Sequence, residues 1–385
     1  MAPPVDLIIR CFSRRRDAAR VEELERRCEA APAGKATVVL QVDTMGDPLC
    51  RVRNSSMHRM LVAELEGELV GMVRGSIKDM TIRSSPEEHA KVGYVLGLQV
   101  SPLHRRRGIA SSLVLKLQEW FVANLVDYAY MATEKSNAAS IKLFTGKLGY
   151  VKFRTLSILV NPVRRRAIRL PPGLKITKLN TDQAERMCRR FMGSTEFFPG
   201  DIDQVLRNRL SLGTWMAYLR EPDGSNAMPA SWAMLSVWDC GQVFKLRVQR
   251  EKGSSCVPYG TKASSLLDRF LLCLGIPGLP DLSNPFGFYF MYGIHGEGPY
   301  AGTLVRALCR YVHNMASLAN DCKVVVAEVG ACDALKLHIP HRRSLSCSED
   351  LWCMKDLKSK DKDAAGFDWT KSPPPPALFV DPREV

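Results

Sequence analysis

The chain has 385 residues, of which 46% are hydrophobic, 24% charged and 8% aromatic. This profile is typical of a folded globular protein and excludes a disordered or fibrous one. No apolar run approaches the roughly 20 residues that cross a bilayer, and the first residues do not resemble a signal peptide. We therefore expect an intracellular protein of the nucleus or cytoplasm, without membrane contact.

The charge and the cysteines narrow the expected ligands. Lysine and arginine outnumber aspartate and glutamate by 54 to 40, which gives a net charge of +14. A surface of this charge attracts anions such as nucleic acid or phosphorylated cofactors. The twelve cysteines show no metal-ligand spacing, so we expect no metal site.

The first half alternates strand and helix patterns. Apolar residues at helical spacing follow the first strand, and a turn at Glu66–Gly67–Glu68 joins two later strands. The expected elements are a strand at 5–12, a helix at 13–31, strands at 60–79, a loop at 80–93, a strand at 94–100, a helix from Ile109, a strand at 128–133, a helix at 136–149 and closing strands at 150–160.

The second half repeats this order. Its expected elements are a strand at 174–179, a helix at 180–193, strands at 213–219 and 231–240, an extra helix at 261–275, a strand at 286–294, a helix ending near 316, a strand at 323–329, a short helix at 331–339 and a strand at 350–357. We infer an internal duplication. The expected division is a first domain at 1–163, a linker at 164–174, a degenerate copy at 175–360 and a proline-rich surface tail at 361–385.

The segment LQVSPLHRRRGIASSLV, residues 98–114, connects a buried strand to a helix through three arginines and Gly108. A helix start exposes unpaired backbone amides and the positive end of the helix dipole. Glycine also lets a phosphate approach the backbone closely. The segment therefore predicts an anion site, in which the residue types suit a pyrophosphate.

The same segment resembles the acetyl-CoA signature RxxGxA of the Gcn5-related N-acetyltransferases, carried here by Arg105, Gly108 and Ala110. The segment NAASIKLFTGKLGY resembles a later part of that family. Further segments, including TEFFPGDIDQVL, FMYGIHGEGP and DWTKSPP, are similar to plant hookless-type N-acetyltransferases over nearly the whole chain. The resemblance implies an α/β (α+β) fold, with a mixed, mostly antiparallel sheet that splays after Val100 and flanking helices, duplicated in a second degenerate copy.

The resemblance also implies acetyl-CoA as co-substrate and a role in plant differential growth. It does not name the acceptor, which we expect to be an amine of a protein or of a small molecule. Pantetheine would lie along the strand, and the backbone amides of 106–111 would hold the pyrophosphate. The residues expected to bind the cofactor are Leu98, Gln99, Val100, Arg105, Arg106, Arg107, Gly108, Ile109, Ala110, Ser111, Asn137 and Phe144.

The catalytic groups are less well marked. Many members of the family have a tyrosine that protonates the thiolate where this chain has Phe144, and some have a glutamate base where it has Ala132. The remaining candidates are Glu134 as a base and Tyr94 and Tyr130 as proton donors.

Three hypotheses follow from these residues. The first is an acetyl-CoA-dependent N-acetyltransferase. The second, favoured by Phe144 and Ala132, is an acyl-CoA-binding regulator without turnover. The third is a basic regulator that associates with nucleic acid through its arginine triplets. The oligomeric state is left open.

Overall fold

The computed structural model describes residues 4, 6–29, 38–82, 88–219, 228–250, 284–358 and 368–385. The first half contains the expected succession of elements and one additional strand, β2. The elements are β1 (Ile8–Cys11), α1 (Arg14–Glu29), β2 (Val38–Asp43), β3 (Met57–Leu65), β4 (Glu68–Thr81), β5 (His89–Val100), the 3₁₀ turn η1 (Pro102–His104), α2 (Ile109–Ala123), β6 (Tyr128–Glu134), α3 (Ala138–Lys147) and β7 (Val151–Pro162).

The second half also follows the expected order, with the additional helix α5 and strand β11. The elements are β8 (Leu174–Leu179), α4 (Thr181–Met192), α5 (Ile202–Arg207), β9 (Ser211–Leu219), β10 (Trp232–Asp239), η2 (Cys240–Gln242), β11 (Lys245–Arg250), β12 (Gly287–Glu297), α7 (Ala301–Ser317), β13 (Cys322–Gly330), η3 (Ala334–His338), β14 (Cys347–Asp356), η4 (Trp369–Lys371) and η5 (Pro382–Glu384). The helix expected at 261–275 lies outside the described residues.

Two local expectations can be compared with these bounds. Glu66 and Gly67 both have positive φ and form the tight turn between β3 and β4, as expected. The loop expected at 80–93 is wrong at both ends, because β4 continues to Thr81 and β5 begins at His89. The short polar stretches at those ends lie in strands because their backbone groups pair across β4 and β5.

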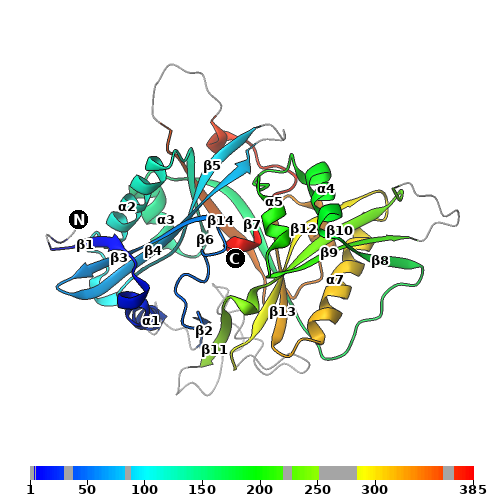
Figure 1. Cartoon of the computed structure of the whole chain (residues 1–385), viewed down its shortest axis with the longest axis horizontal. Helices are drawn as coiled ribbons and strands as arrows, with labels where there is room; N and C mark the ends of the chain where they lie inside the picture. The colour runs from blue at the N-terminus through cyan, green and yellow to red at the C-terminus, as the bar shows by residue number, and fades with distance from the viewer. Residues whose placement is uncertain are drawn as a thin grey trace.

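One continuous sheet of twelve strands runs through both halves, in the order β1-β3-β4-β5-β6-β14-β7-β13-β12-β10-β9-β8 (Figure 1). Its neighbouring strands are antiparallel except for two parallel pairs, β5 with β6 and β12 with β13. The expectation of a mixed, mostly antiparallel sheet is therefore confirmed. β2 and β11 pair with each other in a separate sheet of two strands.

The two halves exchange strands at the centre of the sheet. β14 of the second half lies between β6 and β7 of the first, with Leu351 opposite both Thr133 and Thr155. β7 in turn pairs with β13, where Val160 lies opposite Val326. The strands of the two copies therefore interleave in the sheet, and the linker at 164–174 stays a prediction.

The sheet splits where the first parallel pair ends. β5 pairs with β6 only over Val92–Val95, whereas it remains paired with β4 as far as Val100. The expectation that the strands separate after Val100 is wrong, because a bulge at Gly97, with φ +60°, turns β5 away earlier. Residues 96–100 thus have one strand edge without a partner strand.

The second copy repeats this geometry. β12 pairs with β13 as far as Met291, and Gly293, with φ +56°, follows in a bulge against β10. A helix comes next in both copies, α2 after β5 and α7 after β12. The repeated split, bulge and helix support the inferred duplication.

Helices cover both faces of the sheet (Figure 1). Along β6, Ala129 and Met131 pack in the cluster that contains α2, whereas Tyr128 and Tyr130 belong to a larger cluster that spans both halves. Because strand side chains alternate between faces, this larger cluster lies on the face opposite α2. No helix in the described ranges is long and apolar enough to cross a membrane.

The end of the chain differs from the expected surface tail. The prolines at 373–376 are at least partly exposed, but Phe379, Asp381 and Arg383 are buried, at 3%, 1% and 5% exposure. The C-terminus lies at the centre of the molecule (Figure 1). Its charges have partners in both halves, which the composition of the tail did not reveal: Asp381 pairs with Lys78 of β4 at 2.9 Å, and Arg383 pairs with Asp201 at 2.7 Å.

The Asp381 ion pairs give a first prediction. Burial acts to raise the pKa of Asp381, but Arg383 and Lys78 outweigh it and hold this pKa below its usual range. Replacing Asp381 with Asn leaves both cations short of a partner, so we expect the free energy of unfolding at pH 7 to fall by about 3 kcal/mol. Urea unfolding measures this difference.

The sign of the pH dependence follows from the lowered pKa. The stabilisation by Asp381 is fully present above the pKa of the unfolded carboxyl, about 3.9, and is lost as the pH falls below it. The difference between wild type and Asp381→Asn should therefore shrink on acidification. The exposed Asp182→Asn is the control, and an equal loss of stability in both variants at pH 7 would contradict the assignment.

Candidate functional site

The candidate site begins at the open edge of β5. Leu98 and Val100 are half-buried and pack on the cluster beneath α2, and the strand edge that faced β6 before the split has no partner strand here. Backbone amides and carbonyls at such an edge are available to an extended ligand. The structure thus brings Leu98, Gln99 and Val100 to a position where a ligand can add to the sheet.

The loop after β5 presents its backbone amides. Arg106 and Gly108 have φ of +64° and +82°, and α2 begins at Ile109 without a side-chain cap. Among the described residues, no loop carbonyl or side chain accepts a hydrogen bond from the amides of 106–111. Such a turn into a helix start is an anion-binding arrangement.

The three arginines of this loop are exposed and have no carboxylate partner within the described ranges. Arg105 Nε donates to the carbonyl of Val100 at 3.4 Å, and Arg107 Nη1 lies 3.1 Å from His104 Nδ1. Cations beside a helix N-terminus oppose the helix dipole unless an anion is present. The loop therefore has the charge and the free donors to hold a phosphate group.

Two buried polar atoms lie at the start of this loop. Ser101 is 0% exposed, and its Oγ has no hydrogen-bond partner among the described residues. Gln99 Oε1 is also buried and has no such partner there either. Buried polar atoms are rarely left without a hydrogen bond. Gln99 was expected from the sequence, but Ser101 was not.

Glu134 lies at the end of β6, three residues past Met131, the last residue that pairs with β5. Ser136 Oγ donates to Glu134 Oε2 at 3.1 Å. Directly opposite, on β14, lies Asp350, which is 6% exposed. Sequence reasoning missed Asp350 because only the strand exchange places it beside Glu134.

The environment of Asp350 changes its proton affinity. Burial raises the pKa of Asp350 to about 6; the indole N–H of Trp352 acts against this rise, and the carboxylate of Glu134 adds to it. A carboxyl group with a pKa near neutrality suits a general base.

Tyr94 and Tyr130 lie just before the split, on the face opposite α2. Their rings stack with centroids 4.7 Å apart, and Tyr130 donates its hydroxyl hydrogen bond to Glu384 at 2.5 Å. Both are buried, and burial raises the pKa of each hydroxyl above its usual range. The structure thus places both phenols within the core that underlies the split.

Asn137 and Phe144 both belong to the α3 region. The side chain of Asn137 caps α3 by accepting a hydrogen bond from the Ser140 amide at 3.1 Å. Phe144 is 1% exposed and meets Tyr150 edge to face, with ring centroids 5.0 Å apart. Both side chains are engaged in local packing or capping.

The corresponding loop of the second copy is closed. The ring of His338 covers the first turn of α7, because a Cβ added at Gly302 would lie 2.4 Å from it. The amide of Tyr300 donates to Ser231 Oγ at 3.4 Å. This loop also lacks arginine, so it has neither the charge of the first loop nor its open helix start.

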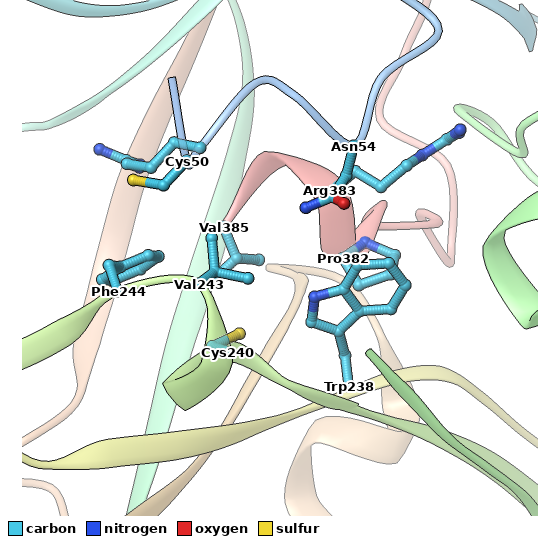
Figure 2. Close-up of a pocket in the computed structure, with 10 residues that line it drawn as sticks. Cys50, Asn54, Trp238, Cys240, Val243, Phe244, Pro382, Arg383 and Val385 are labelled. Atoms are coloured by element: carbon cyan, nitrogen blue, oxygen red, sulfur yellow. The ribbon is translucent and has the colours of Figure 1, made fainter. Parts of the chain in front are cut away.

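Two cavities lie near the junction of the halves. Figure 2 shows the smaller, of about 210 Å³, which Cys50, Asn54, Trp238, Phe244 and Val385 help to line. No residue of the loop between β5 and α2 lines it. The larger, of about 440 Å³, lies at the split between β12 and β13.

Comparisons with known proteins agree with this geometry. The model of the acetyltransferase (GNAT) family matches residues 19–150, which include the loop between β5 and α2. A probable N-acetyltransferase HLS1-like protein of Arabidopsis thaliana is 45% identical over 411 residues, which cover 98% of each chain.

Solved structures show the same fold at low identity. A myristoyl-CoA-bound N-myristoyltransferase of Saccharomyces cerevisiae has a TM-score of 0.54 at 10% identity, over 94% of this chain and 81% of that one. A tandem GNAT protein of the clavulanic acid pathway has a TM-score of 0.51 at 11% identity, over 92% of this chain and all of that one. The chain belongs to the acetyltransferase (GNAT) family, alongside the HLS1 proteins, and is an acyltransferase with a duplicated fold.

Proposed function

We propose that this protein transfers the acetyl group of acetyl-CoA to a primary amine and that the first copy holds the cofactor. The observation that carries the proposal is the loop between β5 and α2, where the unpaired amides of 106–111 lie beside three arginines without carboxylate partners. The phosphates of coenzyme A match this combination of charge and donors.

The residues of β5 and of the loop after it are proposed to contact different parts of the cofactor. Pantetheine is proposed to lie along Leu98, Gln99 and Val100, where its amides extend the sheet at the open edge of β5. Arg105, Arg106 and Arg107 then face the phosphates. A β5 amide between the split and Val100 polarises the thioester carbonyl, and holding the acceptor beside it supplies part of the rate.

The second copy is proposed to contribute no cofactor site. Its helix start is covered by His338, and its loop has no arginine. We propose instead that it completes the site by supplying β14 beside β6. The acceptor is proposed to be an amine of a protein. The resemblance to hookless-type proteins does not name the acceptor, but it supports a proposed role of this enzyme in plant growth.

A second candidate function is binding of acetyl-CoA without turnover. It is favoured by one observation about proton donors. The position of the family's tyrosine is Phe144, which has no hydroxyl, and the phenols of Tyr94 and Tyr130 are buried, so no phenol named from the sequence lies at the open edge of β5. The two functions differ in whether coenzyme A is released when amines are added.

The cofactor site can be tested by replacing Gly108 with Trp. The new side chain blocks approach to the amides of 106–111, so acetyl-CoA affinity should fall at least about 100-fold, equivalent to about 2.7 kcal/mol. Gly67→Trp is the matched control, because Gly67 has nearly the same φ, +79° against +82°, and open space around it. Calorimetric titration that finds equal affinity in both variants would rule out this placement.

The role of the β6 end can be tested with Glu134→Gln. Loss of this carboxylate should lower the rate of coenzyme A release at saturating acceptor at least about 10-fold. A general base contributes 10²–10⁴-fold, and Glu134 lies opposite Asp350, the carboxyl group suited to that role. Acetyl-CoA affinity should not change. The control is Glu119→Gln on the exposed side of α2, and a normal rate in Glu134→Gln would remove Glu134 from the mechanism.

A further inference from the structure

We infer that Asp350 and Glu328, both supplied by the second half, bind the ammonium group of the acceptor and that Asp350 removes its proton. The acceptor class is therefore a primary amine that is cationic at neutral pH. This inference rests on the proposed acetyl transfer, because it assigns the second substrate of that same site.

The first step of the argument is position. Glu134 lies opposite Asp350 across β6 and β14, and Glu328 on β13 lies opposite Ile158 of β7. Each carboxylate is an even number of residues from a side chain of the central cluster on its own strand: Tyr130 on β6, Trp352 on β14 and Val326 on β13. Because side chains alternate along a strand, all three carboxylates lie on the same face of the sheet. That face is the one opposite α2, and the row of carboxylates starts where β5 and β6 separate.

The second step is charge balance. Asp350 is buried and Glu328 is half-buried. Buried carboxylates elsewhere in this region have cations beside them, as in Glu196 with Arg154 at 2.7 Å and Asp381 with Lys78 at 2.9 Å. Neither Asp350 nor Glu328 forms an ion pair with a lysine, arginine or histidine among the residues that the structure describes. Carboxylates withdrawn from water without a partner are unfavourable, so this pair lacks a cation that a substrate ammonium would supply.

The third step is an orphaned donor in the same place. Trp352 lies two residues from Asp350 on β14 and is 3% exposed, and its Nε1 has no hydrogen-bond acceptor. Burial, with the carboxylates of Asp350 and Glu384, raises the pKa of Glu328 well above its usual range. The indole N–H lies near enough to act against this rise in both Glu328 and Asp350, without reversing it. A free buried donor beside two carboxylates is suited to a ligand that carries a carbonyl oxygen next to a cation.

The fourth step is access. Glu328 lines the cavity of about 440 Å³ at the split of β12 and β13, together with Thr195, Gly293, His295 and others. Burial lowers the pKa of His295, against the effect of Glu297, so this ring is neutral at pH 7 and supplies no cation to Glu328. An amine can thus reach Glu328 from the second copy while the cofactor occupies the loop of the first.

The chemistry balances with these groups. The carboxylate of Asp350 takes one proton from the ammonium, and the neutral nitrogen attacks the thioester carbonyl carbon. The new C–N bond forms as the C–S bond breaks, and the second proton of the nitrogen ends on the sulfur of coenzyme A. The groups that face Asp350 are Glu134 from β6, Trp352 from β14 and, beyond β7, Glu328 from β13. The nearest cation of β7 is Arg154, which lies opposite Trp352 and is already paired with Glu196.

A stability signature accompanies this role. Because burial raises the pKa of Asp350 to about 6, the folded state holds this proton more tightly than the unfolded state does. The ionised carboxylate therefore destabilises the fold as the pH rises from about 4 through about 6. Replacing Asp350 with Asn should remove that destabilisation, so the variant gains stability where it loses activity.

The experiment compares Asp350→Asn with Asp356→Asn, an exposed aspartate of the same strand. Acceptors are an N-acetylated peptide with one lysine, spermidine and the uncharged amine aniline. We expect Asp350→Asn to bind acetyl-CoA normally and to lose about 100-fold or more in kcat. The pH profile of its kcat should lack the acidic limb near pH 6. The variant should unfold at a higher temperature than the wild type at pH 8 but not at pH 4. Glu328→Gln should raise the KM for the ammonium acceptors about 10-fold, with a smaller change in kcat.

The outcomes separate this inference from the proposed function. Absence of acetyl-CoA binding by the wild type would overturn both. Normal acetyl-CoA binding overturns the inference alone if Asp350→Asn keeps the kcat and pH profile of the wild type, if only aniline is acetylated, or if no acceptor leads to release of coenzyme A.

Discussion

The backbone ladders that hold β14 between β6 and β7 are the interaction on which the rest of the arrangement depends. An interior strand satisfies its amides and carbonyls on both sides, so removing it would leave two strands with unpaired edges. Since β7 continues the sheet to β13, each copy is completed by the other. The same exchange sets Asp350 opposite Glu134, and the proposed acceptor site therefore exists only when both halves are folded together.

Charge pairing distinguishes the structural part of the central face from the part that we assign to chemistry. Lys78 and Arg383 neutralise the carboxylates of the chain end, and Arg154 neutralises Glu196. These pairs fix the last residues between the halves. Asp350 and Glu328, a short way along the same face, lack such cations in the described part of the chain, and an enzyme commonly keeps a destabilised group of this kind where substrate binds.

The features that could be predicted from the sequence are local ones. The helix start after Gly108 and the turn at Gly67 each depend on a few neighbouring residues, and both are observed. The strand exchange, the buried chain end and the role of Asp350 depend on residues far apart in the chain, for which periodicity gives no signal. The early split at Gly97 was missed because a bulge depends on pairing with the next strand.

The central claim is that the first copy of the fold binds the cofactor and the second supplies the residues that bind the acceptor. Amide hydrogen exchange with and without acetyl-CoA tests it most directly, because each copy has its own loop to report. The account predicts protection of the amides at 106–111 and an unchanged rate at 300–304, which span the N-cap and first turn of α7. Protection confined to 300–304, or no protection at either loop at saturating acetyl-CoA, would contradict it.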